Sequence, residues 1–156
     1  MKKHESDVIS IIKIKNKDLL ISIGYDKKLI IWNLNSYKVI KEINNVHCTF
    51  INGLKEIPNH RVIISGEKDL FIFDYEKMEI IKQIITENKV TCLEIINERL
   101  LLCGCFDGSY LDINLEDLEM KKKDGKEGSF ISSMMKIKND VIAVGLHNGK
   151  LKIYKC

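Results

Sequence analysis

The feature that most constrains the fold is a spacing of about 41 residues that recurs along the whole chain. A large side chain closes an apolar run in each of four segments, and successive closing residues are 41, 40 and 41 apart. The residues that open the segments are 43, 39 and 41 apart. Two landmarks that keep one period over four segments indicate tandem repeats of the same structural unit. The closing residues are Trp32, Phe73, Ile113 and Tyr154, and the opening residues are Val8, Ile51, Val90 and Ile131.

Each segment has the pattern of a small antiparallel sheet. Short runs rich in Ile, Val, Leu and aromatic residues are separated by Asn, Asp, Gly and Lys, and helical periodicity is nearly absent. The basic run MKKKDGK, residues 120–126, is expected to be a solvated strand end and loop. The predicted strands are 8–14, 19–24, 29–33 and 38–43; 50–57, 61–66, 70–74 and 79–84; 90–96, 100–105, 109–113 and 118–122; and 130–137, 141–145 and 150–154.

The stretch HESDVISIIKIKNKDLLISIGYDKKLIIWN, residues 4–33, resembles one blade of a WD-repeat (WD40) β-propeller. In that family a histidine before the first strand, a hydroxyl in the second, an acid in the next turn and a tryptophan closing the third form a hydrogen-bonded tetrad. The resemblance assigns these roles to His4, Ser22, Asp26 and Trp32, and Asn33 replaces the aspartate of the usual Trp-Asp pair. Such a network would satisfy polar groups inside the blade.

The other segments match the tetrad less completely. His47 and Ser65 are eighteen residues apart, as in the first segment, and are assigned the same two roles. In the third segment Asp107 takes the place of the turn acid, and Cys103 replaces the hydroxyl. The resemblance implies an all-β fold of about four propeller blades, three complete plus three strands of a fourth. The whole chain, 1–156, is expected to be one WD-repeat domain with approximate blades 4–44, 45–86, 87–126 and 127–156.

An incomplete or open ring is expected, because WD-type rings generally have seven or eight blades, about twice this length. The terminal blades of an open ring leave strand edges and sheet faces exposed to water. Three arrangements remain open: a segment of a longer propeller, a ring completed by a homo- or hetero-oligomer, and an open arc.

Composition restricts the classes of function. The net charge is only +3, and the bases are nearly all lysine, with arginine at Arg61 and Arg99 alone. Nucleic-acid readers favour arginine, so nucleic-acid binding through the lysine-rich surface is a weaker alternative. The five cysteines show no zinc-ligand spacing, and no metal or cofactor is expected. The apolar runs are far shorter than the roughly 20 residues of a membrane span, and no signal peptide is evident, so a cytoplasmic, non-membrane protein is expected.

Catalytic motifs are missing as well. No nucleophile elbow, paired carboxylates or phosphate-binding loop is recognisable, so we expect a protein that is not an enzyme. Function is expected instead at the turns between second and third strands, where aromatic rings recur just before the turn acid. Such rings either anchor a protein or peptide partner or pack onto a neighbouring blade. The predicted partner-binding residues are Tyr25, Phe106, His147, Lys27, Lys68 and Asp69.

The main hypothesis is therefore a protein–protein interaction scaffold that docks partners through surface loops. The alternative of a different class is an architectural subunit, or half-propeller, that assembles through its open blade faces.

Overall fold

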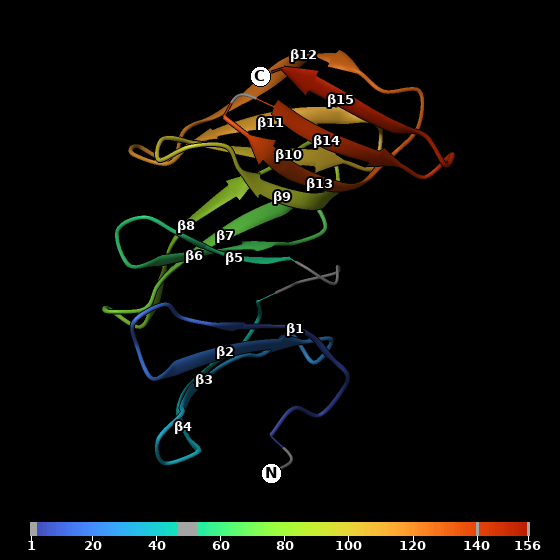
Figure 1. Cartoon of the computed structure of the whole chain (residues 1–156). Helices are drawn as coiled ribbons and strands as arrows, with labels where there is room; N and C mark the ends of the chain where they lie inside the picture. Colours follow the sequence, from blue (N-terminus) through green and yellow to red (C-terminus); the bar gives the residue numbers. More distant parts are fainter. Residues whose placement is uncertain (1–2, 47–52, 140, 156) are drawn as a thin grey trace. The chain divides into compact units, whose positions relative to one another are not determined.

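The computed structural model describes residues 3–46, 53–139 and 141–155, and these residues form four antiparallel sheets without any helix (Figure 1). Three sheets have four strands and one has three, each in the sequential order of a meander. The all-β fold predicted from the sequence, with three complete blades and three strands of a fourth, is confirmed.

The strands are numbered in chain order. Sheet one contains β1 (Val8–Lys13), β2 (Leu19–Gly24), β3 (Leu29–Asn33) and β4 (Lys38–Ile43). Sheet two contains β5 (Leu54–Ile57), β6 (Arg61–Ser65), β7 (Asp69–Asp74) and β8 (Glu79–Ile85). Sheet three contains β9 (Val90–Ile95), β10 (Leu100–Cys105), β11 (Ser109–Asn114) and β12 (Met120–Lys126). Sheet four contains β13 (Ile131–Lys138), β14 (Val141–Leu146) and β15 (Leu151–Lys155).

The observed strands differ from the expected ones mainly at β12. A strand over 118–122 was predicted, with residues 120–126 as a solvated strand end and loop, and these bounds were wrong, because β12 runs from Met120 to Lys126. The preceding turn is longer than expected: the Leu118 N–H donates to the Asn114 carbonyl at 2.9 Å, and Leu118 has a left-handed φ of 60°. Pairing with β11 therefore starts only at Met120, opposite Ile113.

The repeat is visible in the register of the strands. In every sheet the residue that closes the third strand lies opposite an apolar residue of the second strand. The pairs are Trp32 with Leu20, Phe73 with Val62, Ile113 with Leu101, and Tyr154 with Ile142.

The turn after the third strand also repeats. Asn33, Asp74 and Asn114 follow the closing residue, and the Oδ1 atom of each accepts the N–H two residues later at 2.9 Å. This Asx turn compensates for the absence of glycine, since short polar side chains stabilise tight turns locally. Each turn ends in a non-glycine residue with left-handed φ: Tyr37 (55°), Met78 (57°) and Leu118 (60°).

The chain forms two compact units, residues 1–83 and 84–156, which are called unit 1 and unit 2. In unit 1 the facing sides of sheets one and two share a core that includes Ile21, Ile31, Ile64 and Phe73. In unit 2 sheets three and four share a core that includes Leu102, Tyr110, Ile131 and Val144. Each unit is thus built on face-to-face packing of two twisted sheets.

Candidate functional site

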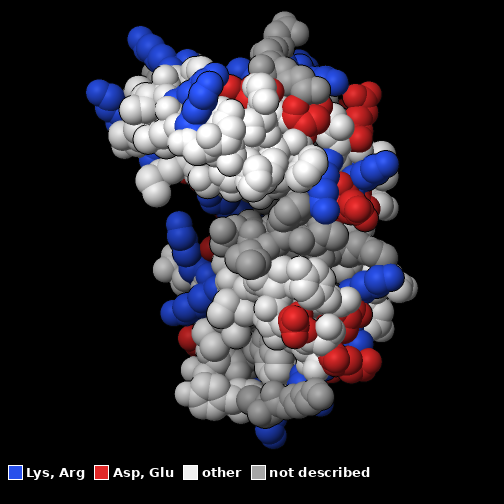
Figure 2. Space-filling view, turned by 90° about the vertical axis from the view of Figure 1, so that its right-hand side faces the viewer, with Lys and Arg blue, Asp and Glu red and all other residues white. Residues whose placement is uncertain are grey.

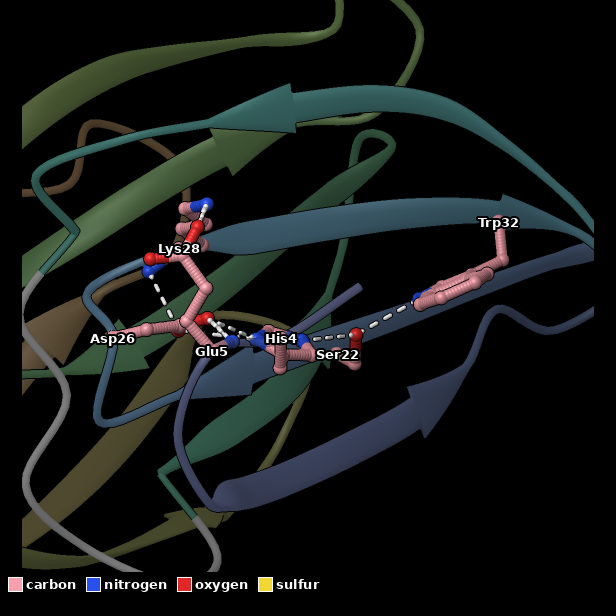
Figure 3. Close-up of polar contacts among 6 residues, drawn as sticks. All are labelled: His4, Glu5, Ser22, Asp26, Lys28 and Trp32. Atoms are coloured by element: carbon pink, nitrogen blue, oxygen red, sulfur yellow. Dashed lines mark hydrogen bonds and ion pairs between the residues drawn. The ribbon is translucent and has the colours of Figure 1, made fainter. Parts of the chain in front are cut away.

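The structure brings His4, Ser22, Asp26 and Trp32 together in one chain of hydrogen bonds (Figure 3). His4 precedes β1, Ser22 lies on β2, Asp26 lies in the turn between β2 and β3, and Trp32 closes β3. His4 Nδ1 lies 3.0 Å from both carboxylate oxygens of Asp26, and His4 Nε2 lies 2.8 Å from Ser22 Oγ. Trp32 Nε1 donates to the same hydroxyl at 2.8 Å.

Donor chemistry fixes the direction of this chain. The Trp32 indole N–H can only donate, so the Ser22 oxygen accepts from it. The Asp26 carboxylate can only accept, which places the proton of a neutral His4 on Nδ1 and leaves Nε2 to accept the Ser22 O–H. All the polar atoms that link these four side chains are satisfied, as buried groups require.

Asp26 is the most heavily hydrogen-bonded member. Its side chain is only 4% exposed, and it also accepts the backbone N–H groups of Glu5 at 2.9 Å and Lys28 at 3.2 Å. Burial acts to raise the pKa of Asp26, but the hydrogen bonds from His4, Glu5 and Lys28 outweigh burial and lower it. Asp26 therefore stays a carboxylate that ties the segment before β1 to the β2–β3 turn.

Gly24 is a member of this site that the sequence interpretation missed. A Cβ atom at Gly24 would lie 2.8 Å from both His4 Nδ1 and Asp26 Oδ1. The histidine and the carboxylate therefore pack directly on bare backbone. The sequence signal that could have identified Gly24 is a glycine two residues before the acid of the turn.

The second segment does not reproduce the arrangement of the first. Ser65 is buried at the end of β6 and pairs with Leu70, three residues before Phe73. Ser22 pairs with a residue only two positions before its closing tryptophan. Because side chains alternate along a strand, this shift puts Ser65 on the opposite face from the residue paired with Phe73. The equal sequence spacing was misleading because the second hairpin is shorter, and His47 lies outside the described residues.

The third segment keeps the acid with other partners. Asp107 accepts the backbone N–H and hydroxyl of Ser109, and its second oxygen accepts the Asn88 side-chain N–H at 3.1 Å. Cys103 is fully buried where the first segment has a hydroxyl. An amide thus replaces the histidine as the donor to the acid.

Glu127 is a buried polar residue that the sequence interpretation did not single out. It lies four residues before Ile131, the same offset as His4 before Val8. Its Oε1 accepts the hydroxyls of Tyr110, at 2.8 Å, and Tyr154, and its Oε2 pairs with Lys152 Nζ at 2.6 Å. Burial acts to raise the pKa of Glu127, but Lys152 and the two tyrosine hydroxyls lower it. In unit 2 a carboxylate therefore occupies the histidine position and reaches the closing residue of β15 directly.

Two rings at turn tips and Phe130, which directly precedes β13, form a partly exposed cluster on unit 2. Phe130 is stacked between Phe106, at a centroid distance of 4.9 Å, and His147, at 4.1 Å. Phe106 is nevertheless 54% exposed, and His147 is exposed. We call these three residues the aromatic stack. Phe130 was not predicted, although its carbonyl accepts the His147 N–H at 3.1 Å.

The remaining predicted partner-binding residues lie on unit 1. Tyr25 is 54% exposed, and Lys27 is exposed at a left-handed φ of 60° in the same turn. Lys68 and Asp69 line a hollow of about 700 Å³, together with Gln83, whose side-chain N–H donates to Asp69 at 2.8 Å. The structure brings Lys68 and Asp69 into one surface feature, whereas Tyr25 and Lys27 belong to a different hairpin.

Chemically reactive groupings are scarce in the described part of the chain. Cys92, Cys103 and Cys105 are buried free thiols, and burial raises the pKa of Cys92 and Cys105 to about 11, so they remain protonated at neutral pH. Among the described residues no group of three or more His, Cys, Asp or Glu side chains could hold a metal ion. Within the same ranges no helix has the length and apolar character needed to cross a bilayer.

Charge is mixed rather than concentrated. On the face drawn in Figure 2, lysine and arginine side chains lie among aspartate and glutamate side chains, with uncharged stretches between them. The described residues drawn in this view therefore show charges of both signs on each unit, whereas nucleic-acid binding favours a continuous basic surface.

No family model matches the chain. It is similar to the WD repeat-containing protein 55 homolog of Dictyostelium discoideum, with 24% identity over 141 residues. The match covers 88% of this chain and 34% of that protein, so the chain spans about a third of the length of this curated relative.

Solved structures share the fold at low sequence identity. The chain matches a protein of the Mitotic Checkpoint Complex with a TM-score of 0.82 and 13% identity, over 99% of this chain and 50% of that one. It matches the computationally designed Ika4 protein with a TM-score of 0.77 and 11% identity, over 99% and 94%. Ika8, also designed, gives 0.75 and 13%, over 97% and 47%. The recurring four-strand sheet, the curated relative and these folds confirm the resemblance to WD40 propeller proteins.

Proposed function

We propose that this chain is a non-catalytic interaction scaffold that binds protein or peptide partners through the aromatic residues at its turn tips. The observation that carries the proposal is the aromatic stack, in which Phe106 remains 54% exposed while its ring is stacked on Phe130. A partner is expected to cover the outer faces of these rings inside the cell.

Exposed aromatic rings that are already held in place suit binding. Stacking on Phe130 fixes the orientation of both Phe106 and His147, so little side-chain freedom is lost when a partner docks. Phe and Tyr supply large contact areas, and such residues dominate the affinity of many interfaces. The curated relative, a WD repeat-containing protein, supports a scaffold role at this general level.

Tyr25 supports the same role from unit 1. Its N–H donates to the carbonyl of Asp7 at 3.0 Å, just as the Phe106 N–H donates to Lys89 at 2.8 Å. The two rings therefore occupy the same backbone position in different segments, and both are 54% exposed. We propose Tyr25 as a second anchor, and Lys27, Lys68 and Asp69 as polar contacts at the rim.

The test compares Phe106→Ala with the wild type. Proteins that bind the immobilised wild-type chain in a cell extract are identified, and the affinity of the most enriched one is then measured with purified components. Phe106→Ala is expected to weaken this binding by about tenfold or more, because it removes an anchor ring. Phe106→Tyr, which keeps the stack, is expected to bind nearly as well as the wild type.

Tyr37→Ala is the matched control, because Tyr37 is 67% exposed at a turn between third and fourth strands. It is expected to leave the affinity unchanged. If Phe106→Ala lowers the melting temperature but binds as tightly as the wild type, the ring serves packing and the proposal is wrong. Failure of the wild type to recover any specific partner would also contradict it.

A further inference from the structure

Sheet three ends in a strand that is unusually basic. The run MKKKDGK, residues 120–126, forms β12, which pairs only with β11 and is therefore an edge strand of this four-stranded sheet (Figure 1). The side chains of Lys121, Lys122 and Lys123 are all exposed. A run that the sequence analysis treated as a solvated strand end and loop is thus a row of cations along the edge of a sheet.

One backbone edge of β12 is available for pairing with another strand. Residues 120–123 keep a continuous antiparallel register with β11, from Met120 opposite Ile113 to Lys123 opposite Tyr110. On the other side, none of the described backbone hydrogen bonds joins these residues to a segment outside sheet three. An edge of this kind presents N–H and C=O groups to which an extended peptide can add as a further strand.

The charge of β12 exceeds what protection of a sheet edge requires. Lysine on an edge strand prevents like edges from pairing, and the equivalent fourth strands of the first two sheets achieve this with mixed charge. β4 contains Lys38 and Lys41 but also Glu42, and β8 contains Lys82 but also Glu79. In β12 three lysines follow one another without an acid among them. Such an edge disfavours basic strands and favours an acidic one.

The lysines of β12 lie on both faces of the sheet. Because side chains alternate along a strand, Lys121 and Lys123 lie on one face and Lys122 lies on the other. Asp112 of β11 lies opposite Lys121, but its Oδ1 atom is buried without a hydrogen-bond partner among the described residues, and the two side chains form no ion pair. The positive charge of Lys121 is therefore directed away from this acid.

Only one of the three lysines has an ion pair within the described ranges, and that pair is exposed. Lys122 Nζ lies 3.2 Å from Glu87 Oε2, and the two side chains are 58% and 81% exposed. A pair in this setting contributes little free energy. Lys122 can therefore exchange Glu87 for the carboxylate of a bound peptide at little cost.

We propose that an acidic, extended segment of a protein partner adds to the β12 edge and extends sheet three by one strand. Carboxylates at consecutive positions of such a segment alternate between its two faces, so they meet Lys121 and Lys123 on one face and Lys122 on the other. Backbone hydrogen bonds supply affinity, and the charge pairs select acidic sequences. The pairing of β12 with β11 shifts after Lys123, which limits the site to residues 120–123.

This site is separate from the proposed aromatic anchors. It shares no residue with the aromatic stack or with Tyr25, and it recognises a partner by charge and backbone pairing rather than by ring contacts. The inference therefore does not depend on the proposed function.

The test is a titration of the full chain with a synthetic peptide in which three consecutive glutamates are flanked by valine and threonine. Amide NMR signals report binding, and those of residues 120–123 are expected to shift. The double variant Lys121→Glu/Lys123→Glu is expected to raise the dissociation constant about tenfold or more, because two attractive cross-strand pairs become repulsive. Rising salt is expected to weaken binding to the wild type, because these pairs are exposed.

Controls separate strand addition from general charge attraction. Lys38→Glu/Lys41→Glu makes the same charge change at two exposed lysines of β4 and is expected to bind the peptide like the wild type. The same peptide with N-methyl groups on alternate residues keeps its charge but cannot pair fully, so it is expected to bind at least tenfold more weakly. Circular dichroism melting should show each variant folded, and Phe106→Ala is expected to retain peptide binding.

Four results would overturn the proposal. They are no binding of the acidic peptide to the wild type, unchanged binding to Lys121→Glu/Lys123→Glu, equal binding of the N-methylated peptide, and shifts confined to signals outside β12. Tighter binding of a single-stranded oligonucleotide than of the peptide at residues 120–123 would also overturn it, because the edge would then be a nucleic-acid surface.

Discussion

Replacing Trp32 by phenylalanine tests whether the tetrad stabilises unit 1. The substitution removes the only donor that reaches Ser22 Oγ from β3, across a distance of 2.8 Å, and part of the ring volume. A net hydrogen bond contributes about 1 kcal/mol, and leaving a buried acceptor unsatisfied costs about 1–3 kcal/mol. The small loss of volume adds to this.

The expected loss of stability is therefore about 1–3 kcal/mol, which corresponds to a fall in melting temperature of roughly 2–12 °C for a chain of this size. Denaturant unfolding followed by circular dichroism is the suitable assay, because the variant has lost the only tryptophan of the chain. Thermal melts provide an independent estimate.

A double-mutant cycle with Ser22→Ala identifies the interaction responsible. Because Trp32 and Ser22 share one hydrogen bond, the double variant should be less destabilised than the sum of the single variants, by about 0.5–1.5 kcal/mol. Strict additivity, or an effect of Trp32→Phe below about 0.3 kcal/mol, would refute the reasoning. Either result would mean that the bond does not contribute to folding.

Three further substitutions test other parts of the structure. Because the pKa of Asp26 is lowered from 3.8 in the folded chain, its stabilisation is present above that pH and is lost as the pH falls through the folded-state value. Asp26→Asn should therefore cost about 1–3 kcal/mol at neutral pH, and denaturant unfolding should show this difference shrinking below about pH 4. Glu127→Gln should lower the free energy of unfolding by about 1–2 kcal/mol, because it weakens the pair with Lys152. In a Lys152→Met background the same substitution should cause only a small additional loss. Gly108→Ala should lower the melting temperature more than Gly149→Ala, since both glycines have left-handed φ but only the Cβ at Gly108 would clash, with the Glu127 carbonyl oxygen; equal shifts would contradict this.

The sheets could be predicted from the sequence because blade formation depends on local signals. Apolar runs separated by turn residues locate the ends of each strand to within a few residues. The 41-residue period then shows which strands of the four sheets are equivalent. The prediction of β12 was wrong because the turn before it depends on side-chain acceptors and on the left-handed φ of Leu118. The residue types in this turn do not predict that conformation.

Equal spacing predicted the polar site only where the hairpin had the expected length. His4, Ser22, Asp26 and Trp32 meet because the register of β2 with β3 puts Ser22 and Trp32 on the same face of sheet one. In sheet two the shorter hairpin changes the register, so Ser65 lies on the wrong face although it is eighteen residues from His47. Glu127 escaped notice because a glutamate is not the expected residue type, and its position could be identified only by its offset from Ile131.

The different networks of the segments solve one physical problem. In the first and third segments a side chain from the loop that enters the sheet bonds the acid in the turn between the second and third strands, His4 with Asp26 and Asn88 with Asp107. In the first segment Asp26 accepts the N–H groups of Glu5 and Lys28, so it fixes backbone in the entering loop and on the far side of the turn. Tyr25, next to this anchored residue, is thereby presented on a rigid turn while its ring stays exposed. A buried polar network of this kind therefore stabilises the blade and, in the proposed scaffold role, also orients the residue that contacts a partner.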